Sequence, residues 1–337
     1  MNRFEYTRPA TVAEAVAALN EPAARALAGG TNLVDLMKYD VAQPSRLVDI
    51  NQLPLKSIEI TSGGALRVGA LVTNSDLAWH PKVREKWPML SSAILAGASP
   101  QLRNAATTGG NLMQRTRCYY FYDPSTACNK REARSGCSAI GGVNRIHAIL
   151  GTSDSCIAVH PSDMCVAMAA LDASVQVEGA EGRRSIPMSG FHRLPGGEPE
   201  RDNTLKVGEL ITSITVPQPD FGAHYTYLKI RDRLSYAFAL VSVAAALRVE
   251  EGIIQDVRIA LGGVAHKPWR DFDAERSLKG ERAGTQSFAQ VADFILRDAK
   301  GQGENDFKID LARRAIVRAL EQAVAGTPQD QSDKSIQ

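Results

Sequence analysis

The sequence predicts an α+β protein in which a larger N-terminal domain is followed by a smaller C-terminal domain. Strand-like and helical patterns alternate over the first 50 residues, and short strands and helices continue to about residue 216. The segment 217-PQPDFG-222 combines prolines, a glycine and a charge, as linkers between domains often do. After it, three long strand-like runs precede two helical runs, an order typical of an antiparallel sheet covered by helices.

The beginning of the chain is expected to read β-α-β-α-β. Thr11 and Glu14 have the spacing of a capping box, which predicts a helix that ends near Asn20. The elements expected after it are a strand at 25–28, a helix at 31–38 and a strand at 46–50. They form a first subdomain, residues 1–55, of an N-terminal domain that spans residues 1–220.

The second subdomain, residues 56–220, is expected to mix short strands with helices. Ser75 is the predicted N-cap of a helix that reaches Trp87. The other expected elements are strands at 57–61, 65–72, 174–179 and 209–217 and helices at 89–98 and 162–173. Residues 99–160 are rich in Gly, Asn, Arg and Cys and lack periodicity, and irregular stretches of this length are usually functional.

The C-terminal α+β domain is predicted to span residues 224–326. Its expected elements are strands at 225–230, 238–249 and 253–265 and helices at 287–300 and 307–325. The polar tail, residues 327–337, is predicted to be disordered.

Composition excludes some functions and favours one compartment. A formal net charge of +2 gives no electrostatic reason to expect binding to nucleic acid or to a membrane surface. No apolar run reaches about 18 residues, so no membrane span is expected, and the N-terminus lacks the apolar core of a secretory signal. The sequence alone therefore predicts a cytoplasmic protein, and a periplasmic location stays open through export with a partner that carries the signal.

The loop 28-AGGTNLVDLMK-38 lies between a predicted strand and a predicted helix. Gly29 and Gly30 can adopt positive φ and let the backbone approach a ligand. The N–H groups of Thr31, Asn32 and Leu33 follow where a helix start favours an anion such as a pyrophosphate. A tight turn without a ligand is the alternative. The loop is not the G-x-G-x-x-G fingerprint of nicotinamide-binding folds.

A second glycine-rich segment is 107-TTGGNL-112. Its two threonine hydroxyls, its glycine N–H groups and its asparagine amide are suited to phosphate or ribityl oxygens. A plain hairpin turn is the alternative. Both loops together favour a dinucleotide, which needs several polar contacts of this kind.

The cysteines permit several interpretations. Cys118, Cys128, Cys137 and Cys156 are separated by 9, 8 and 18 residues, without the C-x-x-C unit of most structural zinc sites. A reducing compartment disfavours disulfides. Four thiolates suit a 4Fe–4S cluster, and ordinary buried thiols remain possible. Flanking cations that would offset its charge are Arg115, Arg117, Lys130, Arg131 and Arg134. Cys165 is expected to be a small buried residue of an apolar helix.

These motifs resemble one family when they are taken together. AGGTNL near residue 30, TTGGN near 107, PSD at 161–163 and the lysine of 225-YTYLKIR-231 resemble the flavin subunit of the xanthine dehydrogenase family of molybdenum hydroxylases. The resemblance implies a two-part FAD-binding domain of the vanillyl-alcohol-oxidase (PCMH) type, followed by the small α+β domain known from the CO dehydrogenase flavoprotein.

One departure from the family is informative. In most members the GGN and SD elements lie within about ten residues of each other, whereas Asn111 and Ser162 are some fifty apart, and the insertion at about 113–160 carries the four cysteines. This resembles the subgroup with an additional 4Fe–4S cluster in the flavin subunit. Periplasmic aldehyde oxidoreductases of that subgroup are the most similar, in RTRCYYFYD, CNKR, SGC, CIAVHPSDM and RDRLSYAFALVSVAAAL.

The resemblance also implies roles for individual residues. Cys118, Cys128, Cys137 and Cys156 become the cluster ligands, and Ala28 through Leu33 hold the FAD pyrophosphate. Asp163 is expected to hydrogen-bond the cofactor, Ile211 to pack on it and Lys229 to lie near its ring. The residues expected on the flavin side are Thr107, Thr108, Gly110 and Asn111.

The function implied is electron transfer. A molybdenum-cofactor-binding large subunit would oxidise an aldehyde or N-heterocycle, and a 2Fe–2S small subunit would deliver electrons to FAD in this chain and then to an external acceptor. The alternatives are a stand-alone FAD oxidase of the vanillyl-alcohol-oxidase type and a non-enzymatic scaffold or metal-binding protein.

Overall fold

The N-terminal subdomain is a small parallel sheet with two helices. The computed structural model describes residues 1–331. Strands β1 (Glu5–Thr7), β2 (Ala24–Leu27) and β3 (Arg46–Asp49) pair in the order β1-β3-β2. The helices are α1 (Val12–Leu19) and α2 (Leu33–Lys38). Thr11 caps α1 by accepting a hydrogen bond from Glu14 N, whereas the Glu14 carboxylate accepts from Ala10 N. Half of the predicted capping box is therefore present.

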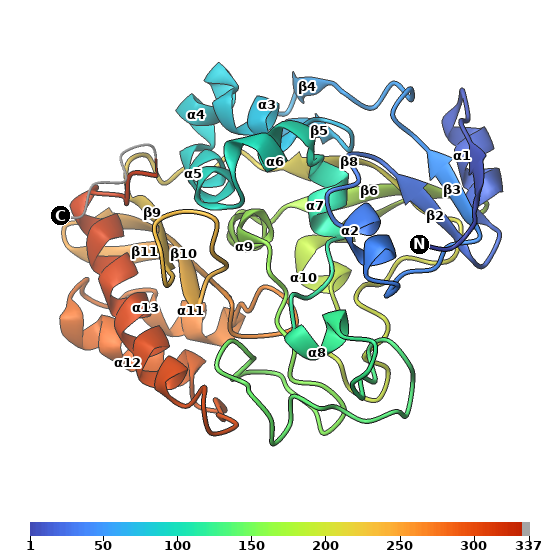
Figure 1. Ribbon diagram of the computed structural model, residues 1–337. Coiled ribbons are helices and arrows are strands. Elements are labelled where there is room, and N and C mark those ends of the chain that lie inside the picture. Colours follow the sequence, from blue (N-terminus) through green and yellow to red (C-terminus); the bar gives the residue numbers. More distant parts are fainter. Residues whose placement is uncertain (332–337) are drawn as a thin grey trace.

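A five-stranded antiparallel sheet forms the second subdomain (Figure 1). Its strands, in the order β4-β5-β8-β6-β7, are β4 (Ile58–Ile60), β5 (Leu66–Gly69), β8 (Leu210–Val216), β6 (Ser174–Gly179) and β7 (Gly182–Pro187). The sequence did not predict β7. Its sequence GRRSIP contains few strand-forming residues, so the hairpin with β6 depends on tertiary pairing.

The helix predicted from Ser75 to Trp87 is wrong as one element. Thr73 caps α3 (Asn74–Trp79), and a separate helix, α4 (Pro81–Lys86), follows. His80 is extended, with ψ 125°, because the next residue is a proline that disfavours helical geometry before it. The other helices of this part are α5 (Pro88–Ala96), α6 (Pro100–Ala105), α7 (Thr108–Leu112), α8 (Tyr119–Tyr122), α9 (Asp163–Ala170) and α10 (Met188–Phe191). The segment 107-TTGGNL-112 is thus a short helix and no hairpin turn.

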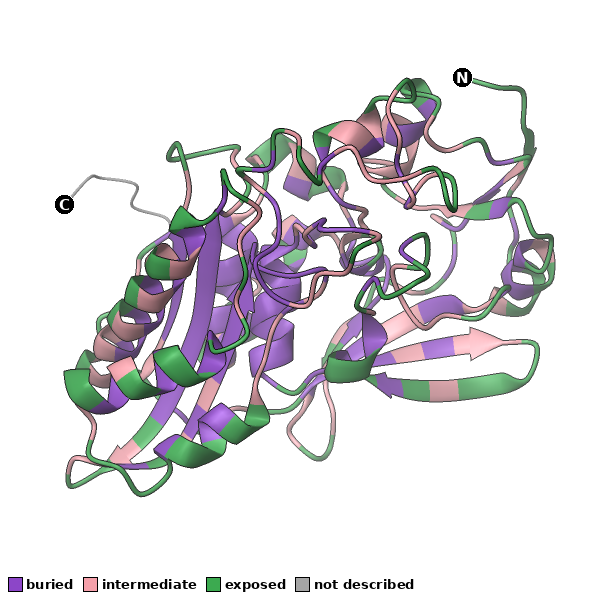
Figure 2. Cartoon of the chain, turned by 90° about the horizontal axis from the view of Figure 1, so that it is seen from below, coloured by how far each residue is buried: buried purple, intermediate pink, exposed green. Residues whose placement is uncertain are grey.

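The C-terminal part is an antiparallel sheet buried on both faces. Strands β9 (Tyr225–Ile230), β10 (Val241–Glu250) and β11 (Ile253–Gly262) pair in the order β11-β10-β9, and the helices are α11 (Phe272–Leu278), α12 (Thr285–Ile295) and α13 (Phe307–Ala325). Alternate residues of β10 belong to different cores: Ala244 and Ala246 pack with α9, and Val243 and Ala245 with α12 and α13. Figure 2 shows this sheet as a buried layer beneath the helices.

The C-terminal part differs from the prediction in several places, including α12 and β11, which end at Ile295 and Gly262 and not at residues 300 and 265. The residues 238–240 precede β10 as loop, and α11 was not predicted. Residues 327–331 do not form a disordered tail, because Gln329 accepts a hydrogen bond from Lys229 N and Gln331 donates to Tyr227 O. The rest of the predicted tail, 332–337, lies outside the described residues. No helix in the described part of the chain is both long and apolar enough to cross a bilayer.

Residues 113–160 run along one side of the molecule with little regular structure, the short α8 apart (Figure 1). They connect α7 with α9 and also contact the C-terminal part, since Asn305 Nδ2 donates to Ala148 O at 3.0 Å. The insertion is therefore held by the C-terminal part as well as by its connections to α7 and α9.

Candidate functional site: two adjacent cavities

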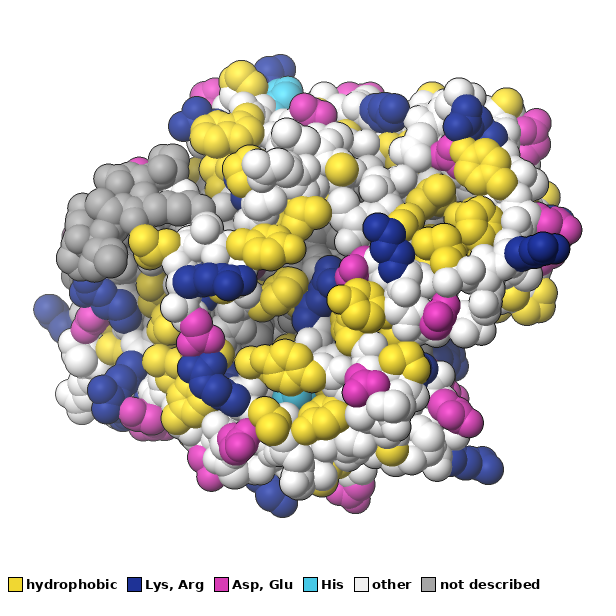
Figure 3. All heavy atoms as spheres, viewed as in Figure 1, with side chains coloured by type: hydrophobic (Ala, Val, Ile, Leu, Met, Phe, Trp, Pro, Cys, Tyr) yellow, Lys and Arg dark blue, Asp and Glu magenta, His cyan; other side chains and the backbone are white. Residues whose placement is uncertain are grey.

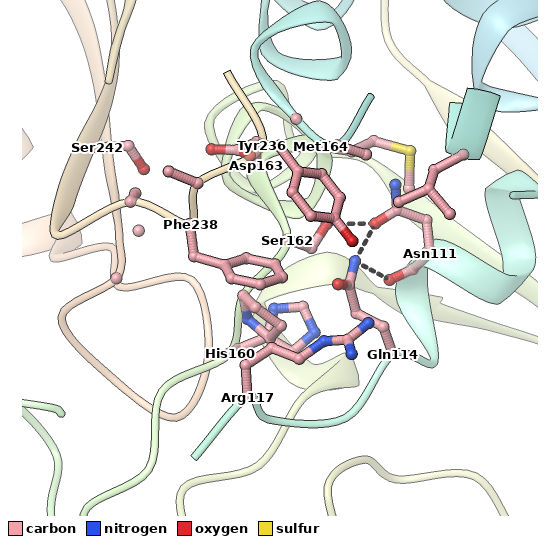
Figure 4. Close-up of a pocket in the computed structure, with 18 of the residues that line it drawn as sticks. Asn111, Gln114, Arg117, His160, Ser162, Asp163, Met164, Tyr236, Phe238 and Ser242 are labelled. Carbon is pink, nitrogen blue, oxygen red and sulfur yellow. Dashed lines mark hydrogen bonds between the residues drawn. The ribbon is translucent and has the colours of Figure 1, made fainter. Parts of the chain in front are cut away.

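A cavity of about 510 Å³ lies between the N-terminal part and the C-terminal sheet. Its walls come from segments distant in the sequence, among them the glycine loop, α6 with α7, the start of α9 and the loop before β10. Its lining includes Thr31, Asn32, Asn74, Arg103, Gly110, Asn111, Gln114, Arg117, His160, Ser162, Asp163, Tyr236 and Phe238. Figure 4 shows Tyr236 and Phe238 opposite Asn111 and Gln114, and Figure 3 shows hydrophobic and basic side chains gathered around the middle of this face.

The glycine loop forms one wall because it approaches α6 closely. A Cβ on Gly29 would lie 1.9 Å from Ala105 O, so only glycine fits there, and Gly30 has φ +71°. Helix α2 begins at Leu33, later than predicted, with Asn32 at its N-cap. Asn32 Oδ1 accepts from Arg115 N at 3.0 Å, while its buried Nδ2 has no partner among the described residues. This donor is available to a ligand.

The TTGGN segment is brought to the cavity by α7. Thr107 Oγ1 caps the helix by accepting from Gly110 N at 3.2 Å, and the buried Thr108 Oγ1 donates to Val72 O at 2.9 Å. Both hydroxyls therefore form hydrogen bonds within the protein, whereas Gly110 and Asn111 line the cavity. Asn111 Oδ1 accepts from Ser162 Oγ at 2.6 Å, which ties this segment to the start of α9 (Figure 4).

Asp163 belongs to a buried ionic network at the start of α9. Its Oδ1 accepts from Tyr227 Oη at 2.6 Å, and its Oδ2 accepts from Lys229 Nζ at 2.8 Å. Burial and the neighbouring carboxylate raise the pKa of Tyr227 well above its ordinary value of 10. Gly97 permits this packing, since a Cβ there would lie 3.1 Å from Asp163 Oδ2. The network joins the two domains at the floor of the cavity.

The predicted flavin residues divide into two groups. Thr31, Asn32, Gly110, Asn111 and Asp163 line the cavity. The others are not among the residues that line it: Ala28, Gly29, Gly30, Leu33, Thr107, Thr108, Ile211 and Lys229. Of these, Ile211 is a buried core residue of β8, and Lys229 is paired with Asp163.

Sequence reasoning did not identify several residues of the cavity. Buried polar atoms with no partner among the described residues are Asn74 Oδ1, Arg103 Nε and both ring nitrogens of His160. Burial, with neighbouring His192, lowers the pKa of His160 well below 6.5, so its ring is neutral at pH 7. His160 directly precedes the PSD motif, which was a usable signal. Phe238 was predicted to begin a strand and Tyr236 was given no role, and their sequence gave no sign that this loop lines the cavity.

The four predicted cysteines line a second, smaller cavity. Cys118, Cys128, Cys137 and Cys156 converge on a space of about 10 Å³, and all five cysteines of the chain are free. Cys128 and Cys137 also face each other across an isolated antiparallel bridge. Cys165 is fully buried in the hydrophobic core, as expected. Residues from 118 to 156 thus bring together four thiols that are far apart in the sequence.

The distances between these four sulfurs argue against a site for a single zinc ion. In a tetrahedral zinc site with Zn–S bonds near 2.3 Å, the sulfurs lie only about 3.8 Å apart. Among the described residues, no three of these four sulfurs lie within 4.8 Å of one another. The four thiols are therefore not arranged as in a single tetrahedral zinc site, and cysteine is also the ligand that 4Fe–4S clusters take.

Two of the four thiols, those of Cys118 and Cys156, are held in the protonated form by burial. Burial raises the pKa of Cys118 to about 12 and that of Cys156 to about 11, the latter against the opposing effect of Lys130. A metal centre would have to displace these protons, because thiolate is the ligand form. Lys130 lines the cavity, and His147 Nε2 lies 3.1 Å from Cys118 Sγ.

The flanking cations have separate roles. Lys130, with 1% of its side chain exposed, is paired with Asp202, which also accepts from Arg115 Nε at 2.7 Å. Arg117 pairs with Asp35. Arg131 Nη1 donates to Tyr120 O, and Arg134 is exposed. Of the five cations proposed to offset cluster charge, Lys130 is the one that lines the cysteine cavity.

Comparison with known proteins identifies the family. Residues 2–219 match the family model described as the FAD binding domain in molybdopterin dehydrogenase. The chain belongs to this flavoprotein family. Residues 223–323 match the CO dehydrogenase flavoprotein C-terminal domain. The two models together cover the α+β parts that the structure shows on either side of the linker.

Relatives of this family match nearly the whole chain. The aldehyde oxidoreductase FAD-binding subunit PaoB of Escherichia coli is 50% identical over 327 residues, covering 96% of this chain and 99% of that protein. The carbon monoxide dehydrogenase medium chain of Hydrogenophaga pseudoflava is 28% identical over 330 residues. Its solved structure superposes with a TM-score of 0.76, covering 96% of this chain and 98% of that one. Quinoline 2-oxidoreductase from Pseudomonas putida 86 gives 0.74 at 25% identity.

The larger cavity fits the flavin dinucleotide that defines the family. FAD combines polar phosphate and ribityl groups with an aromatic ring system. The cavity offers unpartnered polar atoms of Asn32, Asn74 and Arg103, and apolar surface from Phe238 and Met164. The residues present therefore suit both ends of the molecule.

Proposed function

We propose that this chain is the FAD- and 4Fe–4S-containing electron-transfer subunit of a molybdenum-dependent oxidoreductase that acts on aldehydes or N-heterocycles. In this proposal, a molybdenum-cofactor-binding large subunit and a 2Fe–2S small subunit supply electrons, and an external acceptor removes them. FAD, when bound, supports such a role because it accepts and releases electrons one or two at a time.

The adjacency of the two cavities carries the proposal. Cys156 and Ala158 line the cysteine cavity, and Val159 through Met164 line the larger one. One short segment of chain is thus shared by both walls. Two redox groups held this way would be neighbours, which is the arrangement that an electron-transfer subunit requires.

The protein's own contribution is to bind and orient the cofactor. Asn32, Gly110 and Asn111 are the residues that we propose to contact its polar part, and Asp163 to hydrogen-bond it at the start of α9. Tyr236 and Phe238 line the opposite side. Lys229 holds the Asp163 carboxylate in place from behind.

Similarity favours an aldehyde as the substrate of the assembly. The relative with 50% identity is an aldehyde oxidoreductase subunit, whereas the nicotine 6-hydroxylase medium subunit is 27% identical. We also propose that the chain folds in the cytoplasm and that its final compartment follows that of its partner subunits.

Cofactor analysis tests the proposal. The purified chain is expected to contain about one FAD and about four iron atoms, as a 4Fe–4S cluster requires, with an EPR signal after reduction by dithionite. Absence of flavin would overturn the electron-transfer role. Zinc in place of iron would overturn the cluster.

Two cysteine variants distinguish a thiol that lines the cysteine cavity from the thiol of Cys165. Cys128→Ser is expected to lose the iron and the EPR signal, because Cys128 lines the cysteine cavity. Cys165→Ala is the control, since Cys165 is also buried but lies in the hydrophobic core and does not line the cysteine cavity. Equal iron contents in the two variants would contradict the ligand set.

A further inference from the structure

His147 is a buried side chain of the insertion that points at a predicted cluster ligand. It is 1% exposed and lines the cysteine cavity, and its Nε2 lies 3.1 Å from Cys118 Sγ. Its Nδ1 is buried without a partner among the described residues. The contact with the sulfur is of hydrogen-bond length, and the Asn144 carbonyl is a second polar group near the ring.

The direction of this hydrogen bond follows from the chemistry of a ligand thiol. A cysteine that binds iron is a thiolate and carries no proton. A contact between two heavy atoms at hydrogen-bonding distance then requires the proton to be on the nitrogen. A hydrogen bond between this ring and a ligand sulfur therefore has Nε2 as its donor, which a neutral ring provides in the tautomer with its proton on Nε2.

We infer that His147 is a positioning residue that donates a hydrogen bond to the Cys118 thiolate and raises the reduction potential of the centre held by the four cysteines. This inference rests on the proposed function. A donor at the sulfur draws negative charge away from the cluster, and the reduced form, which carries one more electron, gains more from it than the oxidised form.

The backbone of His147 is fixed by the C-terminal part. Lys308 Nζ donates to His147 O at 2.8 Å, and Asn305 Nδ2 donates to the same oxygen at 3.2 Å. On the other side, His147 N donates to Asn144 O at 2.9 Å. Both donors to the carbonyl are fully buried at the start of α13. A ring held from a rigid helix keeps its direction toward the sulfur, whereas a ring on a free loop would not.

Lys130 is a separate influence on the same cavity. It acts as a charge near Cys156, on which it opposes the effect of burial. The Cys156 sulfur has a long contact from Ala158 N at 3.5 Å. His147 is distinct because it reaches Cys118 with a directional side-chain donor.

The test compares three substitutions in the complete protein with its cluster. His147→Phe removes the donor and keeps a ring of similar size. His147→Gln keeps an N–H close to the position of Nε2. His224→Phe is the matched control, because the ring of His224 contacts carbonyls of α13 and does not line the cysteine cavity. The midpoint potential is measured by EPR-monitored titration with dithionite as the one-electron reductant.

The expected result is a lower potential in His147→Phe, a potential close to that of the natural protein in His147→Gln, and no shift in His224→Phe. Loss of the cluster from His147→Phe with retention in His147→Gln would support the inference equally. Equal potentials in the natural protein and His147→Phe, or the same loss in both His147 variants, would overturn it. Absence of iron from the natural protein is a separate outcome that overturns the proposed function instead.

Discussion

Single residues in this protein decide how closely distant segments approach each other. Gly29 and Ala105 belong to different elements, yet the backbone of α6 fills the space where a side chain of residue 29 would be. Asp202 comes from a loop before β8 and meets Lys130 and Arg115 of the insertion. The loop of Gly29 and helix α6 both contribute residues to the lining of the larger cavity, and Lys130 lines the cysteine cavity.

Gly29→Ala is expected to destabilise the chain by roughly 1–3 kcal/mol, the usual cost of inserting a methyl group into filled space. The loop must move away from Ala105 O, so flavin content should fall as well. Urea unfolding and the ratio of flavin to protein measure the two effects. Gly197→Ala is the control, because a Cβ there meets no atom within 4 Å. Equal stability of the two variants would contradict the steric argument.

Asp202→Asn is expected to cost roughly 3–5 kcal/mol at neutral pH, because it leaves the buried Lys130 charge without its partner. Burial disfavours the carboxylate, but Lys130 and Arg115 outweigh it and hold the pKa of Asp202 well below 3.8. A carboxyl whose pKa is lower in the folded than in the unfolded state stabilises the fold above about pH 4. That contribution is lost as the pH falls further.

Urea unfolding at about pH 7 and about pH 3 measures this difference, which should narrow at the lower pH. Asp298→Asn is the control, since its side chain is 82% exposed and lies 3.7 Å from Arg297. Exposed pairs of this kind contribute at most about 1 kcal/mol. If the difference in unfolding free energy between the natural protein and Asp202→Asn grows as the pH falls, the assigned direction of the Asp202 pKa shift is wrong.

At the scale of elements, regular patterns were predictable and irregular ones were not. Helix α13 and strand β9 have the bounds that the sequence predicted, because their apolar periodicity extends to their ends. The break at His80 was missed although Pro81 signalled it, and β7 was missed because its residues alternate poorly. The insertion carries no periodicity at all, so its path depends on contacts with α13 that only a three-dimensional structure reveals.

Asn305→Leu is expected to loosen the insertion where α13 holds it. The carbonyl of Ala148 loses its donor, and a buried acceptor without a partner costs roughly 1–3 kcal/mol. Hydrogen exchange should speed up at the amides of Ile149 and Leu150, which donate to Val264 O, more than in strand β10.

The control for this experiment is Asp310→Asn on the same helix, which removes an exposed ion pair with Arg314. It should leave exchange in the insertion unchanged. If hydrogen exchange speeds up equally across the whole chain in the Asn305 variant, the substitution destabilises the protein generally. That result would contradict a local role of Asn305 in holding the insertion.

At the scale of the whole molecule, α9 is the element around which the two domains assemble. It packs between the five-stranded sheet and the C-terminal sheet, and its first residue accepts hydrogen bonds from two residues of β9 (Figure 1). The fold class and the family were predictable from the sequence, through the order of patterns and motifs. The pairing of Asp163 with Lys229 was not, because their distance in the sequence hides a contact made across the domain boundary.

Lys229→Met is expected to destabilise the whole molecule by roughly 3–5 kcal/mol, because Asp163 stays buried while losing its charged partner. Tyr227→Phe removes a single hydrogen bond from the same carboxylate and should cost only about 1–2 kcal/mol. Thermal unfolding and flavin content measure both variants. A larger loss in Tyr227→Phe than in Lys229→Met would show that the ion pair does not hold the domains together.

The contacts of Asn305 and Lys308 with His147 also set a sequence of events during synthesis. They join residues 158 and 161 positions apart, so the insertion leaves the ribosome long before its anchor exists. At roughly 5–20 residues per second, that interval is on the order of ten seconds or more. The residues that line the cysteine cavity, from Thr116 to Ala158, are all synthesised before this anchor exists. The start of the last helix thus fixes the backbone of His147 late in synthesis, and a nascent chain interrupted before residue 305 would lack that anchor.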